Sequence, residues 1–309
     1  EDGDVAVTIT GTLSTSDHIS ALNLVAAATT GDINGTVSAV AAVTNTLNIS
    51  HGSRTANIGV TITDNALLGD YITAKLATDN AVQITGALRD SLANLTDGSS
   101  ELETAAQNLV SGDTNVAITI TDSSITTASA GFTELNNIAG ATGHIGVITA
   151  TVSGTASDIS TNLGNLGTAD VITFTVTGTS NWTDLQSVDL KTNQAIDVAA
   201  MTDSYTNVYT NMVADVDFDH ADADLTIVST EKIDKSKYDN LDAATDGTVG
   251  FTKIEDTYAN LNAMGSILSG KEVTISDAVT IVELDTIQAF VGGGGTVTYS
   301  VSDTNAVLS

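Results

Sequence analysis

The feature that most constrains this chain is a repeated alternation of a strand pattern and a helix pattern. Stretches in which every second residue is apolar recur along the sequence, and each is followed by apolar residues three or four positions apart. One clear copy is the strand pattern at 273–277, followed by Leu284 and Ile287. The polar residues that close successive strands in the second half are spaced by about 25 residues, at Gly178, Asp203, Thr230, Asp256, Asp277 and Asp303.

A strand, a polar break and a short helix make a βα unit, and a crossover of this length joins parallel strands with right-handed connections. Strands buried on both faces read as continuous apolar runs, whereas here only alternate residues are apolar. We therefore expect an α/β fold, namely a right-handed open βα solenoid of roughly 25-residue repeats. Its parallel sheet would carry helices on one face and a Thr/Ser-rich second face.

The same pattern predicts the domain organisation. Residues 1–309 read as a single repeat array, in which 1–112 are irregular repeats with longer insertions and 113–309 are regular strand-helix repeats. The insertions are placed at 47–59 and 88–112, the second holding one or two helices. Both ends resemble repeat interior, so we expect a processed chain or a window of a longer one. Proline is absent, as expected where nearly every residue belongs to a strand ladder or a helix.

Charge and cysteine content exclude several classes of function. The chain has 38 acidic and 9 basic residues, for a net charge of −29, and no cysteine. Nucleic-acid binding requires clustered cations, and anionic membrane surfaces are disfavoured for the same reason. Disulfides and thiol chemistry are impossible. No apolar run is long enough for a membrane-spanning helix, so we expect no membrane insertion.

Threonine and serine alternate with the apolar residues of the strands. On a parallel sheet such residues would stack in rows about 4.8 Å apart. Threonine is also simply a good residue for an exposed strand, because it is β-branched and polar. The alternative is a hydroxyl-rich binding face, whose candidate residues are Thr61, Thr63, Thr119, Thr121, Thr149, Thr151, Thr173, Thr175, Thr177, Thr274, Ser276 and Thr298.

A second row consists of acids that close strands: Asp64, Asp122, Asp203, Asp256, Asp277 and Asp303. The favoured interpretation is helix capping, because a short acceptor at a helix start satisfies free N–H groups. Stacked carboxylates also suit Ca²⁺, the one cofactor that the sequence leaves open.

The densest acidic segment begins like an EF-hand loop but has His220 at the sixth position and Thr226 at the twelfth, where that motif needs Gly and Glu. We reject the EF-hand and retain two readings, a solvated acidic turn and a looser divalent-cation site. The candidate metal ligands are Asp215, Asp217, Asp219, Asp222 and Asp224.

Motifs for catalysis are missing. The four histidines, at positions 18, 51, 144 and 220, show no metal-ligand spacing, and neither a nucleophile elbow nor a phosphate-binding loop is present. Trp182 is expected to begin a helix and to pack in the core or on a seam. The sequence thus predicts a protein that is not an enzyme, although a carboxylate pair of the glycosidase kind is not marked out or ruled out.

The repeats also resemble those of a known family. The segments 147–159 (VITATVSGTASDI), 132–143 (FTELNNIAGATG) and 273–284 (VTISDAVTIVEL) are similar to repeats of very large cell-surface and extracellular proteins of marine cyanobacteria and related bacteria. That group includes S-layer and motility-associated surface polypeptides. The resemblance implies an extracellular or cell-surface location and carries over no functional residue.

From these observations we expect a structural extracellular protein whose partners are copies of itself, assembled into a layer, sheath or filament. Open solenoid ends supply a physical route to such assembly. The alternative is an adhesin or phage-fibre-like module that binds a surface glycan, or ice, through the Thr-rich face. A polysaccharide-degrading enzyme is a less favoured third reading.

Overall fold

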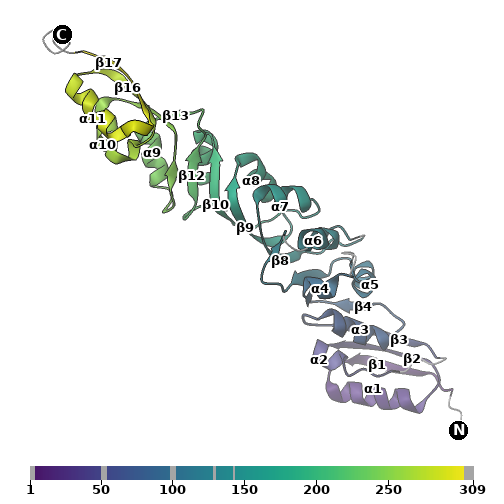
Figure 1. Cartoon of the computed structure of the whole chain (residues 1–309). Helices are drawn as coiled ribbons and strands as arrows, with labels where there is room; N and C mark the ends of the chain where they lie inside the picture. The colour runs from purple at the N-terminus through teal and green to yellow at the C-terminus, as the bar shows by residue number, and fades with distance from the viewer. Residues whose placement is uncertain (1–3, 50–53, 98–101, 128–129, 142, 303–309) are drawn as a thin grey trace. The chain divides into compact units, whose positions relative to one another are not determined.

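The computed structural model describes residues 4–49, 54–97, 102–127, 130–141 and 143–302. The protein is α/β, with parallel strands and intervening helices, as the sequence predicts (Figure 1). Two compact units are present. The first comprises residues 1–153, 158–173 and 190–194, and the second comprises 154–157, 174–189 and 195–309.

The first unit begins with a four-stranded sheet in the order β1-β2-β3-β4, in which every pair is parallel. Its elements are β1 Val7–Leu13, α1 Ser16–Ala28, β2 Ile33–Ala39, α2 Ala41–Thr44, β3 Ala56–Ile62, α3 Leu68–Leu76 and β4 Val82–Ile84. The chain continues through β5 Ala87–Asp90, α4 Leu92–Leu95, α5 Thr104–Gly112, β6 Ala117–Ile120, β7 Ile125–Thr126, α6 Gly131–Ala139, β8 Ile148–Gly154 and α7 Ala156–Asn162. Here β5 pairs with β6, and both β6 and β7 pair with β8, again in parallel.

The second unit holds strands in the order β9-β10-β12-β14, with β11 also paired to β10. The elements are β9 Val171–Ser180, α8 Trp182–Asp189, β10 Ile196–Asp203, the π-helix η1 Thr206–Val213, β11 Phe218–Asp219, β12 Asp224–Ile227 and β14 Val249–Gly250. A separate sheet has the order β13-β15-β16-β17. It is built from β13 Lys232–Ile233, α9 Lys235–Asp242, β15 Lys253–Asp256, α10 Tyr258–Met264, η2 Gly265–Leu268, β16 Glu272–Val279, α11 Ile281–Val291, η3 Gly292–Gly294 and β17 Thr296–Val301.

The core is made of alternate strand residues and one stripe of each longer helix. In β8, Ile148, Ala150 and Val152 are buried, while the residues between them are half-buried. In α1 the buried residues are Ile19, Leu22 and Ala26, which share one helical face. The predicted strand alternation is therefore confirmed, and aliphatic side chains supply most of the core.

Two details differ from the sequence pattern, and both involve short strands of two to four residues. The region expected to be one strand ending at Asp256 contains β14 and β15, which belong to different sheets, and β13 precedes them. The insertion placed at 88–112 begins inside β5 before continuing into α4 and α5. With β13 included, the first region thus holds two more strands than the pattern predicts, and the second region holds one more.

Several glycines lie where the backbone of one turn of chain closely approaches that of the preceding turn. Gly31, Gly146 and Gly247 each lie two residues before a strand, at β2, β8 and β14. A Cβ atom at these positions would collide with backbone atoms of Val5, Val116 and Ala223, respectively. Glycine is needed there for close approach of two backbones and not for an unusual φ.

Replacing Gly146 with Ala should lower the free energy of unfolding by about 1–3 kcal/mol, because the backbone at Val116 has to move. Gly164→Ala is the matched control in the same unit, since a Cβ at Gly164 meets nothing within 4 Å. Urea unfolding of both variants measures the difference. Equal urea midpoints for the two variants would show that the close approach to the backbone of Val116 does not require glycine at position 146.

Candidate functional site

The predicted Thr-rich face consists of residues that are exposed or half-buried. None of its twelve candidates is buried: Thr61, Thr119, Thr149, Thr151, Thr175 and Thr274 are half-buried, whereas Thr63, Thr121, Thr173, Thr177, Ser276 and Thr298 are exposed. Within sheets, Thr119 is in register with Thr149 and Thr274 is in register with Thr298. The rows are mixed, however, because Thr119 also pairs with Arg89 and Thr274 with Glu255. Binding by this face stays a prediction.

The acids that close strands do cap helices, but the helix that each one caps is in the repeat before it. Asp64 accepts a hydrogen bond from the N–H of Ala41, the first residue of α2, at 2.7 Å. Asp203 does the same for Trp182 of α8 at 3.0 Å. The partners are 19 to 30 residues apart, and the remaining pairs are Asp90 with Leu68, Asp122 with Leu92, Glu231 with Tyr205, Asp256 with Lys235, and Asp277 with Tyr258. The expected capping is confirmed with this correction, and Asp303 lies outside the described residues.

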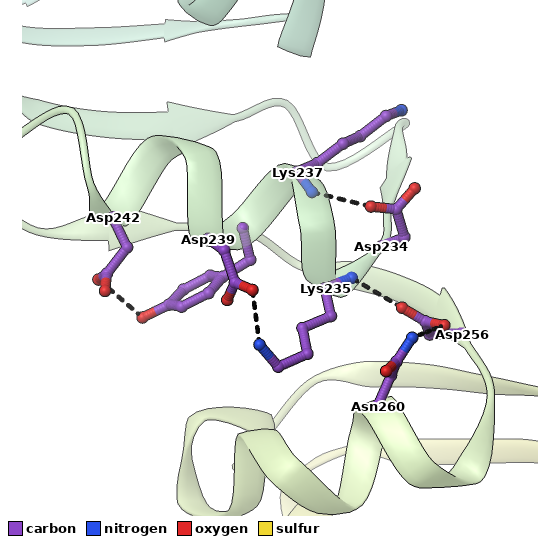
Figure 2. Close-up of polar contacts among 8 residues, drawn as sticks. Asp234, Lys235, Lys237, Asp239, Asp242, Asp256 and Asn260 are labelled. Carbon is purple, nitrogen blue, oxygen red and sulfur yellow. Dashed lines mark hydrogen bonds and ion pairs between the residues drawn. The ribbon is translucent and has the colours of Figure 1, made fainter.

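Three of these acids share a local motif, Asp-Ser/Thr-x-x-Asn, that the sequence analysis missed. It occurs at residues 90–94, 203–207 and 256–260. In the last copy Asp256 accepts hydrogen bonds from the N–H of Lys235 and the side-chain amide of Asn260 (Figure 2). It also accepts one from the N–H of Thr257. One carboxylate thereby ends its own strand, begins the next helix and caps the previous helix. The fixed Asn four residues after each Asp was the available signal.

Hydrogen bonding sets the ionisation of these carboxylates. Partial burial would raise the pKa of Asp203, but hydrogen bonds from Trp182, Asn207 and Ser204 outweigh it and hold the pKa below its usual value of 3.8. The pKa of Asp256 is lowered in the same way, with burial opposed by Lys235, Asn260 and Thr257. Both groups are therefore ionised at neutral pH.

A second series of contacts, not predicted, lies at the opposite ends of the strands. Thr78, Thr192 and Thr245 are buried, and each precedes the first residue of its strand by four positions. The hydroxyl of Thr245 donates to the carbonyl oxygen of Ala223 at 2.7 Å and accepts the N–H of Gly247 at 2.9 Å. Thr78 donates likewise to Ala56, and Thr192 to Ile172. Each buried hydroxyl thus donates a hydrogen bond that joins one repeat to the preceding one and accepts a local N–H.

The predicted metal ligands lie around the turn between η1 and β12, and some serve the backbone. Asp215 accepts the N–H of Asp217, and Asp219 accepts the N–H of Ala221. Asp224 accepts both the N–H and the hydroxyl of Thr248, which lower its pKa. In the part of the chain that the structure describes, no three His, Asp or Glu side chains gather as metal ligands would. Cation binding by Asp215, Asp217, Asp219, Asp222 and Asp224 stays a prediction.

Three histidines make backbone contacts. His144 Nε2 lies 2.9 Å from the carbonyl oxygen of Val116, and His220 Nδ1 lies 3.0 Å from that of Phe218. Nδ1 of His18 accepts the N–H of Ser14, while His51 lies outside the described residues. Within the described ranges, no helix is both long and apolar enough to cross a membrane.

Comparisons with known proteins add no information on function. No family model, curated protein or solved structure matches the chain.

Replacing Asp203 with Ala should lower the free energy of unfolding by about 2–3 kcal/mol, because the backbone N–H groups of Trp182 and Ser204 and the amide of Asn207 all lose their acceptor. Asp197→Ala is the control, since Asp197 is an exposed residue of the same strand, β10. Urea unfolding at pH 7 measures both.

The stability lost on replacing Asp203 with Ala should also depend on pH. A carboxylate whose pKa is depressed by folding stabilises the protein above its unfolded-state pKa, and this contribution disappears as the pH falls through the folded-state value. The difference between wild type and Asp203→Ala should therefore be constant from pH 7 to about 5 and shrink below about 3.8. A difference that persists undiminished at pH 2 would contradict a role for the ionised carboxylate.

Proposed function

We propose that this protein is a structural extracellular protein that assembles with copies of itself into a layer, sheath or filament. The observation that carries the proposal is the repetition of the same inter-repeat hydrogen bonds within each unit. A carboxylate caps the helix of the preceding repeat, and a buried threonine joins neighbouring turns of chain. Such contacts support the arrangement expected from the sequence, a right-handed open βα solenoid.

The last described strand supports growth by addition of further strands. Along its length β17 pairs with β16, and no described strand covers its other edge. Tyr299 and Val301, which alternate with polar residues, are 45% and 36% exposed. An uncovered edge with exposed apolar residues is a template for another strand. In the proposed assembly, a second copy of the chain supplies that strand.

The charge of the chain fits an extracellular setting. A net charge of −29 would make copies repel one another at low ionic strength. Salt screens exposed charges over about 10 Å at 0.1 M, and divalent cations reduce the repulsion further. Assembly is therefore proposed to depend on salt or Ca²⁺, and it requires no catalysis.

Electron microscopy and analytical ultracentrifugation of the purified chain, at low and high salt with and without Ca²⁺, test the proposal. We expect ordered polymers at high salt or with Ca²⁺, and monomers at low salt. The double variant Tyr299→Lys/Val301→Lys should stay monomeric, because it places two charges on the strand that receives the next copy.

The matched control is Val282→Lys, which adds a charge at a 73% exposed position of α11 and should assemble as the wild type does. Monodisperse monomers under every condition would sink the proposal. If the double variant assembles as the wild type does, β17 is not the strand through which copies of the chain associate.

The alternative function, glycan binding by the Thr-rich face, is favoured by one local feature. A hollow of about 210 Å³ lies over β15, β16 and β17, where Thr274, Thr296 and Thr298 line it together with Lys253 and Glu272. The ammonium of Lys253 lies 3.3 Å from the carboxylate of Glu272. Hydroxyl groups beside a fixed ion pair suit the polar surface of a sugar.

A glycan array tests this second candidate. Replacing Thr274 and Thr298 with Lys should abolish any glycan binding that this face supplies, since both side chains line the hollow. Thr286→Lys on α11 is the control, because Thr286 is half-buried, as Thr274 is, but does not line the hollow. Binding that survives the double substitution would place the glycan elsewhere.

A further inference from the structure

A second hollow, in the second unit, differs in its chemistry from the Thr-rich face. It is a shallow depression of about 390 Å³ formed by α8, the end of η1 and the turn that follows. Its lining residues are Trp182, Thr210, Asn211, Ala214, Asp215 and Val216.

Trp182 is the only tryptophan of the chain, and its ring packs against another aromatic ring. The indole ring contacts the buried ring of Phe218 edge to face, with 5.7 Å between centroids and an angle of 63°. The side chain nevertheless stays half-exposed on the hollow, so the sequence-based expectation of a simple packing role describes only part of it. Its indole N–H has no hydrogen-bond partner among the described residues, although tryptophan N–H groups usually find one when buried.

The polar groups beside this ring are also free to bind. The Thr210 hydroxyl has no partner in the described ranges, and it is exposed. The Asn211 amide donates to Asn207 Oδ1 at 2.9 Å, which orients its carbonyl oxygen without occupying it. Asp215 accepts the N–H of Asp217 through one oxygen and keeps the other. A hydroxyl group that can donate and accept, a second amide N–H and several acceptor oxygens therefore lie beside an aromatic ring.

The backbone at this site is unusual as well. Thr210 and Asn211 belong to η1, which is a π-helix of eight residues and the one π-helix assigned within the described segments. π-Helical turns are rare and are frequent at functional sites. Val216, at the rim, is 90% exposed, which is costly for an apolar residue unless something covers it.

Charge restricts what this hollow accepts. Asp215 lines the hollow. The pKa of Asp189 is raised mainly by burial and further by the negative charges of Asp217 and Asp215, so these three carboxyl groups lie near one another. Three carboxylates produce a negative potential that repels anionic ligands. A ligand with hydroxyl groups and no negative charge meets both the polar and the apolar requirements.

We propose that the hollow around Trp182 binds an uncharged pyranose unit of a glycan. The C–H face of the sugar lies against the indole ring, whose π face is negative, and the sugar hydroxyls bond with Thr210, Asn211 and Asp215. This site is separate from the Thr-rich face and does not depend on self-assembly.

Fluorescence of the single tryptophan gives a direct test. The intact chain, kept monomeric at low salt, is titrated with uncharged tetrasaccharides of glucose, mannose or galactose. The comparison probes are tetragalacturonate, which is anionic, and tetramethylammonium, which a tryptophan flanked by carboxylates attracts as a cation. We expect a saturable change in Trp182 emission with at least one uncharged sugar and none with tetragalacturonate.

Variants then locate the site. Thr210→Ala and Asn211→Ala should each weaken binding about 2- to 10-fold, as the loss of one hydrogen bond predicts. Thr183→Ala is the control, since Thr183 is exposed next to Trp182 on α8 but does not line the hollow. Circular dichroism confirms that each variant is folded.

The proposal is overturned if no uncharged sugar changes the emission up to its solubility limit. A response to tetramethylammonium alone would overturn it in favour of a cation site. Sugar binding that Thr210→Ala and Asn211→Ala leave intact, but Thr274→Lys/Thr298→Lys abolishes, would assign the glycan to the Thr-rich face.

Discussion

The interaction on which the rest of the structure depends is the hydrogen bond from a helix N-terminus to a carboxylate of the following repeat. The first N–H groups of a helix have no partner within the helix, and an anion there is also favoured by the helix dipole. Here the acceptor comes from the strand end of the next repeat, as Asp203 does for Trp182. Where this hydrogen bond is present, one contact both caps a helix and joins two repeats. Other helices, such as α1 and α11, are capped by Thr15 and Thr280, which directly precede them in the chain.

Buried threonines perform the corresponding task at the other ends of the strands. Thr78 and Thr245 bond to backbone carbonyl oxygens of the preceding turn of chain, while glycines such as Gly247 allow that turn to approach closely. Together these contacts position the strands in parallel register without requiring large side chains. This explains how a chain with 4% aromatic residues and no proline still buries a core made mostly of aliphatic side chains. Its single tryptophan is consequently the exception, and it sits at a hollow with unpaired polar groups.

The acidic character of the protein has two physically different origins. Acids such as Asp90 and Asp256 are held by two backbone N–H groups and a side-chain amide, so their charge is used within the fold. Asp215 and Asp219, in contrast, each accept one N–H from a residue two positions further along and keep an oxygen atom that no described residue binds. The first group contributes to local order, and the second leaves a negative surface that repels anions at low ionic strength.

The sequence by itself determined the α/β class, the parallel strands, the alternation of buried and exposed strand residues and the capping role of the strand-closing acids. Period and composition express these features directly, because each depends on residues close together in the chain. Only the tertiary structure decided which helix each acid caps, since the partner lies in another repeat. It alone revealed β13, which is too short to show alternation, and the π-helix that places Thr210 and Asn211 beside Trp182. Those arrangements depend on contacts between residues of different repeats, and the pattern within one repeat does not encode such contacts.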